Sequence, residues 1–233
     1  HFAKWEFSAR HHMTASDAQS VTVGELLTLA GQPADALADL HLGYTETWGA
    51  PDLREAIAAT YDTLSADDVL CFAGAEEGVY TAMRVLLAND DHASGVTPNY
   101  QAAETVPLDI CEVTGVALDA SQHWRLDPDA VRAAIRPNTR LVSVCFPNNP
   151  TGAIPSHEDF AELVAICREH DLYLFSDEVY RLLELDAAKR IDQAADAYEK
   201  GLSLNVMSKA YGLPGLRIGW LACRARSALQ RQA

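Results

Sequence analysis

The sequence predicts an α/β fold in which layers of helices cover a mostly parallel sheet. Apolar segments of strand length alternate with amphipathic helical segments along most of the 233-residue chain, which is the pattern of a layered α/β domain. Residues 141–146 are apolar on both faces, as expected for a buried parallel strand. Four expected strands are followed by polar segments, and the carboxyl ends of parallel strands meet at one edge of a sheet.

The elements are assigned in chain order from periodicity and turn residues. Residues 1–45 have an irregular pattern and are expected to form an N-terminal arm around a short helix at 23–30. Residues 46–233 are expected to form one large domain. Its expected helices are 53–64, 76–87, 101–107, 128–135 and 156–170, and its expected strands are 69–72, 93–97, 113–118, 141–146, 172–175, 202–206 and 216–222.

Local signals mark the starts of two of these helices. Asp127 before Pro128 is a favourable N-cap and first-turn pair. Ser156 and Asp159 have the spacing of a capping box. The strand at 93–97 is weaker than the others because its serine and glycine are poor strand residues.

Charge and cysteine usage exclude several classes of protein. With 18 Lys and Arg against 33 Asp and Glu, the formal net charge is −15, which argues against nucleic acid and anionic membranes as partners. The five cysteines are scattered, odd in number and never in a C-x-x-C pair. Buried thiols in a reducing compartment, and hence a cytoplasmic protein, are therefore expected. His11 and His12 lack the spacing of a helical metal pair, so no metal site is expected.

Two polar segments follow strands and have both a functional and a purely structural interpretation. Gly74, Ala75 and Glu76 end a strand and open a helix, so their backbone N–H groups could bind an anion at the helix N-terminus. Taken alone, the same residues are more often a tight turn, because turn glycines are common. Residues 148–152 (NNPTG) have the composition of a turn, which needs no ligand.

Three charged residues lie next to expected buried strands. Asp177 directly follows one, where it could cap a helix or pair with the protonated ring nitrogen of a ligand. Lys209 follows another, and a partly buried lysine has a depressed pKa and becomes a nucleophilic amine, although most lysines are solvated. Arg217 is expected to begin a strand and would need an anionic partner if buried.

Together these segments resemble the class I/II aminotransferases, fold-type I enzymes that use pyridoxal 5′-phosphate (PLP). The most specific match is residues 208–220, SKAYGLPGLRIGW, which is similar to the family's Schiff-base lysine segment. Residues 149–152 (NPTG) and 177–180 (DEVY) match two further motifs in the right order. The resemblance implies a three-layer sandwich whose C-terminal small domain is missing, so that residues 46–233 would be a C-terminally incomplete PLP-binding large domain.

The resemblance also implies catalytic roles. Lys209 would hold PLP covalently as a Schiff base and later move the substrate's proton. Asp177 would pair with the pyridine N–H and keep the ring protonated. Asn149 and Tyr180 would hydrogen-bond the ring's phenolic oxygen, and Tyr180 is counted with Lys209 and Asp177 as catalytic.

Further positions would bind other parts of the cofactor. Arg217 would bind the phosphate with help from the backbone around Gly74, Ala75 and Glu76. Ser208 belongs to the lysine segment and Tyr100 would stack on the ring. Tyr44 resembles the tyrosine that reaches the phosphate of a neighbouring subunit, which implies a homodimer with shared active sites.

Departures from the family pattern leave the reaction open. The family usually has Ser or Thr where this chain has Val206, and the arginine for the substrate carboxylate is expected beyond Ala233. The favoured function is an aminotransferase acting between an amino acid and a 2-oxo acid. A PLP-dependent lyase, cyclase or oxidase shares the same motifs. A PLP-binding module without activity is less favoured because Lys209 and Asp177 are both present.

Overall fold

The computed structural model describes residues 2–13 and 15–224 and contains a seven-stranded sheet. Its strands are β1 (Val69–Phe72), β2 (His92–Thr97), β3 (Glu112–Ala117), β4 (Thr139–Cys145), β5 (Tyr173–Asp177), β6 (Gly201–Val206) and β7 (Gly219–Ala222). Their spatial order is β1-β7-β6-β5-β4-β2-β3. Only β7 runs antiparallel to its neighbours in this sheet. The predicted mostly parallel sheet is therefore confirmed, and six strands end at the same edge.

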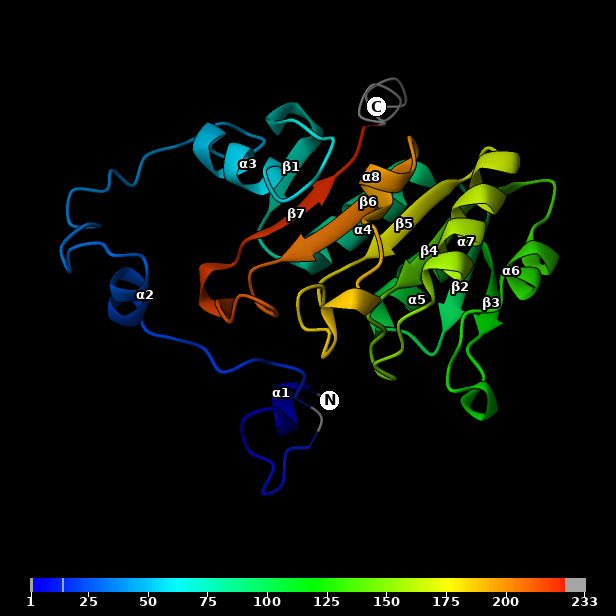
Figure 1. Ribbon diagram of the computed structural model, residues 1–233, viewed down its shortest axis with the longest axis horizontal. Helices are drawn as coiled ribbons and strands as arrows, with labels where there is room; N and C mark the ends of the chain where they lie inside the picture. The colour runs from blue at the N-terminus through cyan, green and yellow to red at the C-terminus, as the bar shows by residue number, and fades with distance from the viewer. Residues whose placement is uncertain (1, 14, 225–233) are drawn as a thin grey trace.

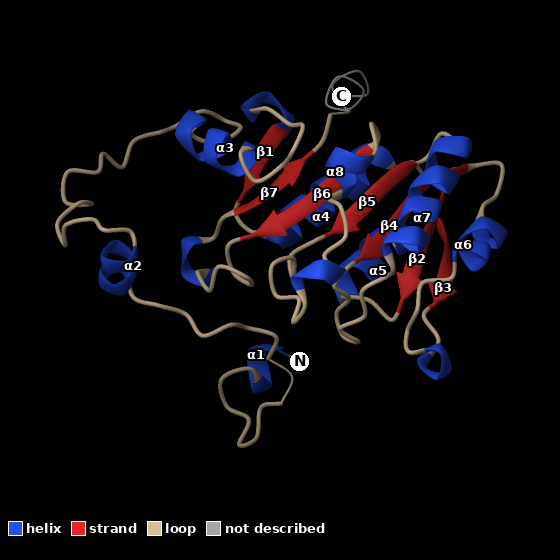
Figure 2. Ribbon diagram, viewed as in Figure 1, coloured by secondary structure: helices blue, strands red, loops and turns tan. Residues whose placement is uncertain are grey.

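Helices cover both faces of this sheet (Figures 1 and 2). The helices are α1 (Phe2–Trp5), α2 (Val23–Leu29), α3 (Pro51–Ala58), α4 (Ala75–Leu86), α5 (Gln101–Leu108), α6 (Pro128–Ala134), α7 (His157–Glu169) and α8 (Ala194–Ala197). Side chains of α4 and α5 pack in one core cluster, and those of α6, α7 and α8 pack in another. The three-layer arrangement is confirmed.

Strands β4 and β5 are buried on both faces because each supplies side chains to both clusters. Leu141 of β4 packs on the α4 side, whereas Val142 and Val144 pack on the α7 side. Burial of each such aliphatic side chain stabilises the fold by about 1.5–3 kcal/mol. At the β1 end, Trp220 of β7 packs with residues of α3, and its Nε1 donates to the Tyr61 hydroxyl at 3.1 Å.

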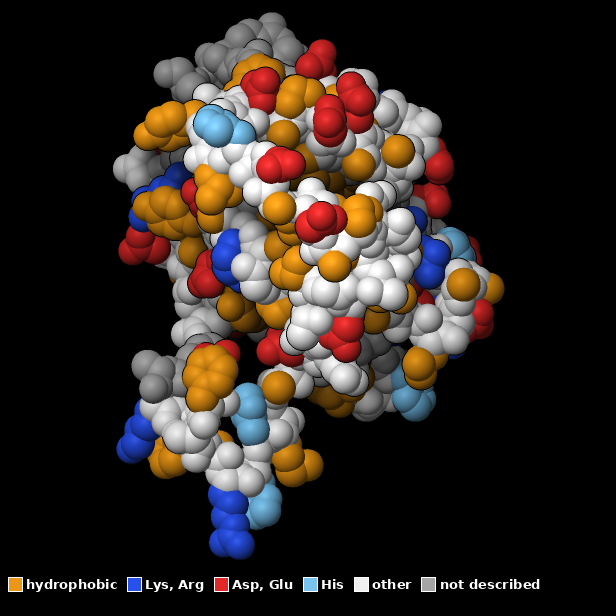
Figure 3. Space-filling model, turned by 90° about the vertical axis from the view of Figure 1, so that its left-hand side faces the viewer, with side chains coloured by type: hydrophobic (Ala, Val, Ile, Leu, Met, Phe, Trp, Pro, Cys, Tyr) orange, Lys and Arg blue, Asp and Glu red, His pale blue; other side chains and the backbone are white. Residues whose placement is uncertain are grey.

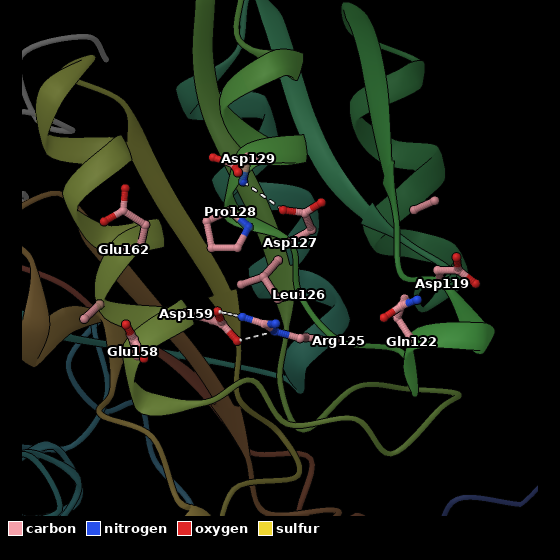
Figure 4. Close-up of a pocket in the computed structure, with 12 residues that line it drawn as sticks. Asp119, Gln122, Arg125, Leu126, Asp127, Pro128, Asp129, Glu158, Asp159 and Glu162 are labelled. Carbon is pink, nitrogen blue, oxygen red and sulfur yellow. Dashed lines mark hydrogen bonds and ion pairs between the residues drawn. The ribbon is translucent and has the colours of Figure 1, made fainter.

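The N-caps predicted for α6 and α7 can be compared with the hydrogen bonds at the starts of these helices (Figure 4). The Asp127 carboxylate caps α6 by accepting from the Asp129 N–H at 3.0 Å. Ser156 caps α7 by accepting from the Asp159 N–H at 3.0 Å. The Asp159 carboxylate, however, accepts two hydrogen bonds from Arg125, at 2.9 and 2.6 Å. Only half of a capping box forms, because the guanidinium offers this buried carboxylate two charge-assisted bonds.

Two predicted elements are shorter in the structure. The helix expected over residues 53–64 ends with α3 at Ala58, and the turn that follows is held by Asp196, whose carboxylate accepts from the N–H groups of Asp62 and Thr63. The strand expected from residue 216 begins at Gly219. Arg217 does not start the strand, since it has a φ of 52° at the end of a 3₁₀ turn.

The segment that precedes α3 extends away from the sheet, with α1 and α2 joined by irregular chain (Figure 1). Thr22 and Glu25 form a complete capping box at the start of α2. Several apolar side chains of this segment are largely exposed: Leu29, Leu37, Leu40, Leu42 and Tyr44. Hydrophobic and acidic side chains are scattered over this side of the molecule (Figure 3).

Candidate active site

A cavity of about 340 Å³ lies at the carboxyl edge of the sheet, where the ends of β1, β5 and β6 meet. Many of the predicted site residues line it: Ala75, Glu76, Tyr100, Asn149, Asp177, Tyr180, Ser208, Lys209 and Arg217. The topology explains this grouping, because parallel strands deliver their following loops to one edge.

Asp177 forms the buried end of the cavity. It is the last residue of β5 and only 4% exposed. Burial raises its pKa to about 6, although a hydrogen bond from the Val179 N–H and the charge of Lys209 act in the opposite direction. A carboxylate with one backbone donor retains several free lone pairs, and its burial favours a cationic or N–H partner.

Asn149 and Tyr180 lie side by side on neighbouring loops. The Asn149 Nδ2 donates to the Tyr180 hydroxyl at 3.3 Å. Buried Asn148 fixes the Asn149 loop, since its Nδ2 donates to the Pro98 carbonyl at 3.2 Å and its Oδ1 accepts from the Thr151 hydroxyl at 2.7 Å. The two polar groups are thus held where both can contact one ligand oxygen.

Glu178 fixes the loop that carries Asp177 and Tyr180. Its Oε1 accepts from the Ala194 N–H at 2.8 Å and from the Ser203 hydroxyl at 2.9 Å. Burial raises the pKa of this carboxyl to about 7. These bonds tie the loop after β5 to α8 and β6, so the neighbouring site residues have a rigid support.

Lys209 lies at the mouth of the cavity, with its side chain 20% exposed. Its Nζ donates to the Ser16 hydroxyl at 3.1 Å and to the Asp17 carboxylate at 2.9 Å. Burial lowers the Lys209 pKa, but the hydrogen bond with Asp17 and nearby negative charge outweigh it, so the pKa is raised. The predicted depressed pKa is wrong for this state, because the sequence did not reveal Asp17 as a partner.

The part of the cavity beside the start of α4 suits an anion. Gly74 is the N-cap of α4 with a φ of 114°, and a Cβ there would lie 2.5 Å from the Arg217 Nη2. A Cβ at Gly219 would lie 2.6 Å from the Gly74 carbonyl carbon. The two glycines therefore allow Arg217 to approach the N-terminus of α4, where backbone N–H groups and a cation act together. Val206 also lines this cavity. The family usually has Ser or Thr at this position, so this chain lacks that hydroxyl as an anion ligand.

Two predicted aromatic residues have different positions. Tyr100 is the N-cap of α5 and lines the cavity, and burial raises the pKa of its phenol. Tyr44 is fully exposed and does not line the cavity of its own chain. The contact of Tyr44 across a dimer interface stays a prediction.

Sequence reasoning missed the residues that the N-terminal segment contributes to the cavity: Glu6, Ser16 and Asp17. The contact between Asp17 and Lys209 joins positions 192 residues apart. No motif or periodicity in the irregular segment indicates such a contact, so no sequence signal could have identified it.

Two further properties concern the described residues as a whole. Within 2–13 and 15–224, no group of three or more His, Cys, Asp or Glu side chains is arranged to hold a metal ion. None of the helices in the same residues combines the length and apolar composition that crossing a membrane requires.

Comparison with known proteins gives a consistent family match. The family model described as aminotransferase class I and II matches residues 23–233. The chain is 32% identical over 229 residues to valine–pyruvate aminotransferase of Mycobacterium tuberculosis, an alignment that covers 93% of this chain and 58% of that protein.

Solved structures agree with this match. A PLP-dependent aminotransferase from Streptococcus suis superposes with a TM-score of 0.91 and 29% identity, covering 99% of this chain and 62% of that one. The PLP-dependent cyclase OrfR superposes with a TM-score of 0.88 and 25% identity, covering 99% and 60%. The chain thus spans less than two thirds of the length of each of these proteins.

Proposed function

The chain belongs to the class I and II aminotransferase family, and from this premise we propose that it is the cofactor-binding part of a PLP-dependent aminotransferase. The reaction would transfer an amino group between an amino acid and a 2-oxo acid. The observation that carries this proposal is the convergence of Lys209, Asp177 and the Asn149–Tyr180 pair on one cavity.

The donor set in the cavity fits PLP group by group. Asp177 is a buried carboxylate suited to a protonated ring nitrogen, and the Asn149–Tyr180 pair suits a phenolic oxygen. Arg217 and the N-terminus of α4 suit the phosphate, and Lys209 is the amine that a carbonyl requires. Pockets of about 300–1,000 Å³ hold small ligands, so a cavity of about 340 Å³ is of adequate size.

Each side chain then has a role that its position supports. PLP, when bound, supplies an electron sink for the carbanion at the substrate α-carbon. Asp177, with a pKa of about 6, is ionised at neutral pH and would keep the ring nitrogen protonated. The Lys209 amine would accept the proton that the substrate loses from its α-carbon and would later donate a proton back to the reacting group. Arg217 would hold the phosphate and so fix the orientation of the ring.

We also propose a homodimer with shared active sites. Tyr44 is exposed in its own chain and lies in a segment in which Leu29, Leu37, Leu40 and Leu42 are exposed as well. An apolar surface of this kind favours contact with another protein surface. Residues 1–45 would form the arm that reaches the partner, and residues 46–233 the cofactor-binding domain. A cytoplasmic location stays a prediction from the cysteine pattern.

A cyclase is the second candidate function, supported by the likeness to OrfR. The relative from Mycobacterium tuberculosis is named for valine and pyruvate, so pyruvate is the first amino acceptor to test. The residues assigned above to PLP would serve both reactions, because both begin with loss of the α-proton of the substrate.

The test is an assay of the full-length protein with single amino acids, each with and without pyruvate or 2-oxoglutarate. An aminotransferase forms a new 2-oxo acid and a new amino acid only when an acceptor is present. A lyase or oxidase releases ammonia, with peroxide for an oxidase, in the absence of acceptor. A cyclase consumes its amino acid and yields a cyclic product without an acceptor. Absence of any acceptor-dependent product over the amino acids tested would contradict the proposal.

A further inference from the structure

Two residues of the N-terminal segment accept hydrogen bonds from the Lys209 amine. The Nζ donates to the Ser16 hydroxyl at 3.1 Å and to the Asp17 carboxylate at 2.9 Å. The Lys209 side chain is 20% exposed and that of Asp17 is 57% exposed. The ion pair therefore lies at the boundary between the cavity and solvent.

The segment is also seated on the loop that follows Lys209. A Cβ at Gly212 would lie 2.9 Å from the Gln19 carbonyl oxygen, and Gly212 has a φ of 66°. A side chain at this position would both strain the backbone and collide with Gln19. The glycine thus permits the chain around Asp17 to lie against the lysine loop, so the ion pair is backed by a second contact.

Several other ionisable groups face the same cavity: Glu6 from the N-terminal segment, Glu76 from α4, Tyr100 from the start of α5, Asp177 and Tyr180 from β5 and its loop, and Arg217 before β7. Among them and Asp17, only Asp17 is hydrogen-bonded to the Lys209 amine in the structure. Its carboxylate stabilises the ammonium form of Lys209, against the effect of burial.

This contact matters for the chemistry of Lys209. An ammonium group must lose a proton, to solvent or to a neighbouring carboxylate, before its nitrogen can attack a carbonyl. The free amine then adds to the carbonyl carbon, and the carbonyl oxygen leaves as water. A partner that stabilises the ammonium form reduces the fraction of reactive amine at neutral pH.

We propose that Asp17 is a positioning residue for Lys209, which, with Ser16, holds the amine as a hydrogen-bonded ammonium and so limits its reaction with carbonyl compounds until the N-terminal segment moves away. This inference rests on the proposed role of Lys209 as the PLP-binding lysine. It adds a function for the N-terminal segment, which would control how readily the cofactor is taken up.

The first test needs no cofactor. The cofactor-stripped full-length protein is treated with trinitrobenzenesulfonate, which reacts with unprotonated amines, and labelling of Lys209 is followed by peptide mass spectrometry. Asp17→Asn should label about two- to fivefold faster, the effect expected for a half-exposed ion pair. Asp35→Asn, which removes the same charge from a residue outside the cavity lining, should leave the rate unchanged.

Salt separates an electrostatic effect from a simple gain of access. Higher ionic strength screens exposed charges, so it should raise the labelling rate of the parent protein toward that of Asp17→Asn and leave the variant unchanged. A variant that labels no faster than its parent, or a difference that persists at high salt, would overturn the inference.

The second test follows uptake of PLP. After addition of PLP, samples are reduced with borohydride and the fixed cofactor on the Lys209 peptide is measured across neutral and alkaline pH. Asp17→Asn should reach a given rate at lower pH, and Asp17→Glu should restore part of the parent profile. Identical profiles would refute the inference while leaving the proposed function intact. If the parent protein shows no covalently fixed PLP at Lys209, the proposed function would be refuted instead.

Discussion

The two sides of the candidate site are built differently. On the sheet side, Asp177 is buried, and the Asn149 and Glu178 loops are held by several short hydrogen bonds to neighbouring elements. On the N-terminal side, Ser16 and Asp17 are exposed and meet the site through the amine of Lys209. The sheet side is therefore pre-organised by its own hydrogen bonds, whereas the N-terminal side contacts the site through the Lys209 amine and through Gln19, which lies against Gly212.

The two carboxylates next to Lys209 show what this difference means for charge. Burial without a full set of donors raises the pKa of Asp177 to about 6. Asp17 remains 57% exposed, so solvent screens its interaction with Lys209 and keeps it small. Substitutions on the sheet side should accordingly change the chemistry far more than those on the N-terminal side.

The largest effect is expected at Lys209, where the two sides meet. Lys209→Ala should abolish covalent retention of PLP and reduce turnover by several orders of magnitude, because no other lysine among the described residues lines this cavity. Borohydride reduction followed by peptide mapping measures the retention. Lys200→Ala is the matched control, since Lys200 pairs with Asp171 outside the cavity. Labelling that persists in Lys209→Ala would show that another lysine binds the cofactor.

The next largest effect is expected from the buried carboxylate. Asp177→Asn should retain the fold and PLP but lower kcat by about 10²- to 10³-fold, since a neutral amide cannot hold the ring nitrogen protonated. Steady-state kinetics with the cofactor content measured in parallel gives the result. Turnover close to that of the parent protein would remove Asp177 from the catalytic groups.

The same substitution should stabilise the fold of the cofactor-free protein, although it lowers activity. The folded-state pKa of Asp177, about 6, exceeds the ordinary value of 3.8, so ionised Asp177 destabilises the fold as pH rises through this window. Asp177→Asn should be more stable than its parent above pH 6, by at most about 3 kcal/mol. The difference should vanish below about pH 4. Urea unfolding of the cofactor-free proteins at several pH values measures it, and a difference independent of pH would contradict the burial argument.

The smallest of these effects is expected for the exposed arm. Tyr44→Phe should weaken PLP binding by about tenfold, the lower limit for a hydrogen bond to a charged group, without altering the fold. Equilibrium titration with PLP measures this loss, and Tyr80→Phe, on the outer side of α4, is the control.

A mixed dimer sharpens the same prediction. If Tyr44 acts across the interface, mixing Tyr44→Phe subunits with Lys209→Ala subunits creates one site with both native residues, and tight binding should return in a fraction of dimers. Tight binding that never returns would mean that Tyr44 acts within its own chain or has no role.

The sequence alone determined the elements and the order in which they bring polar residues to one edge. The seven strands were found from their sequence patterns, although the pattern was weak at β2, and residues 149–152 were correctly placed after β4. Asp177, expected to follow a strand, is instead the last residue of β5. This succeeded because burial on both faces imposes a continuous apolar run, and because parallel strands necessarily end at a common edge. Where the chain left this regular pattern, as around Arg217, local interpretation began the strand at residue 216, three residues before β7 begins at Gly219.

Only the tertiary structure decided which groups surround the Lys209 amine. The sequence predicted a depressed pKa from partial burial, and the structure shows a raised pKa, because Asp17 approaches from a segment 192 positions away. The Asp159 carboxylate likewise does not complete the expected capping box with Ser156, because it binds Arg125, which is 34 positions away. The physical reason is the same in both cases. Backbone pattern is set by neighbours in sequence, whereas the protonation and partners of a side chain depend on charges that only folding brings within hydrogen-bond distance.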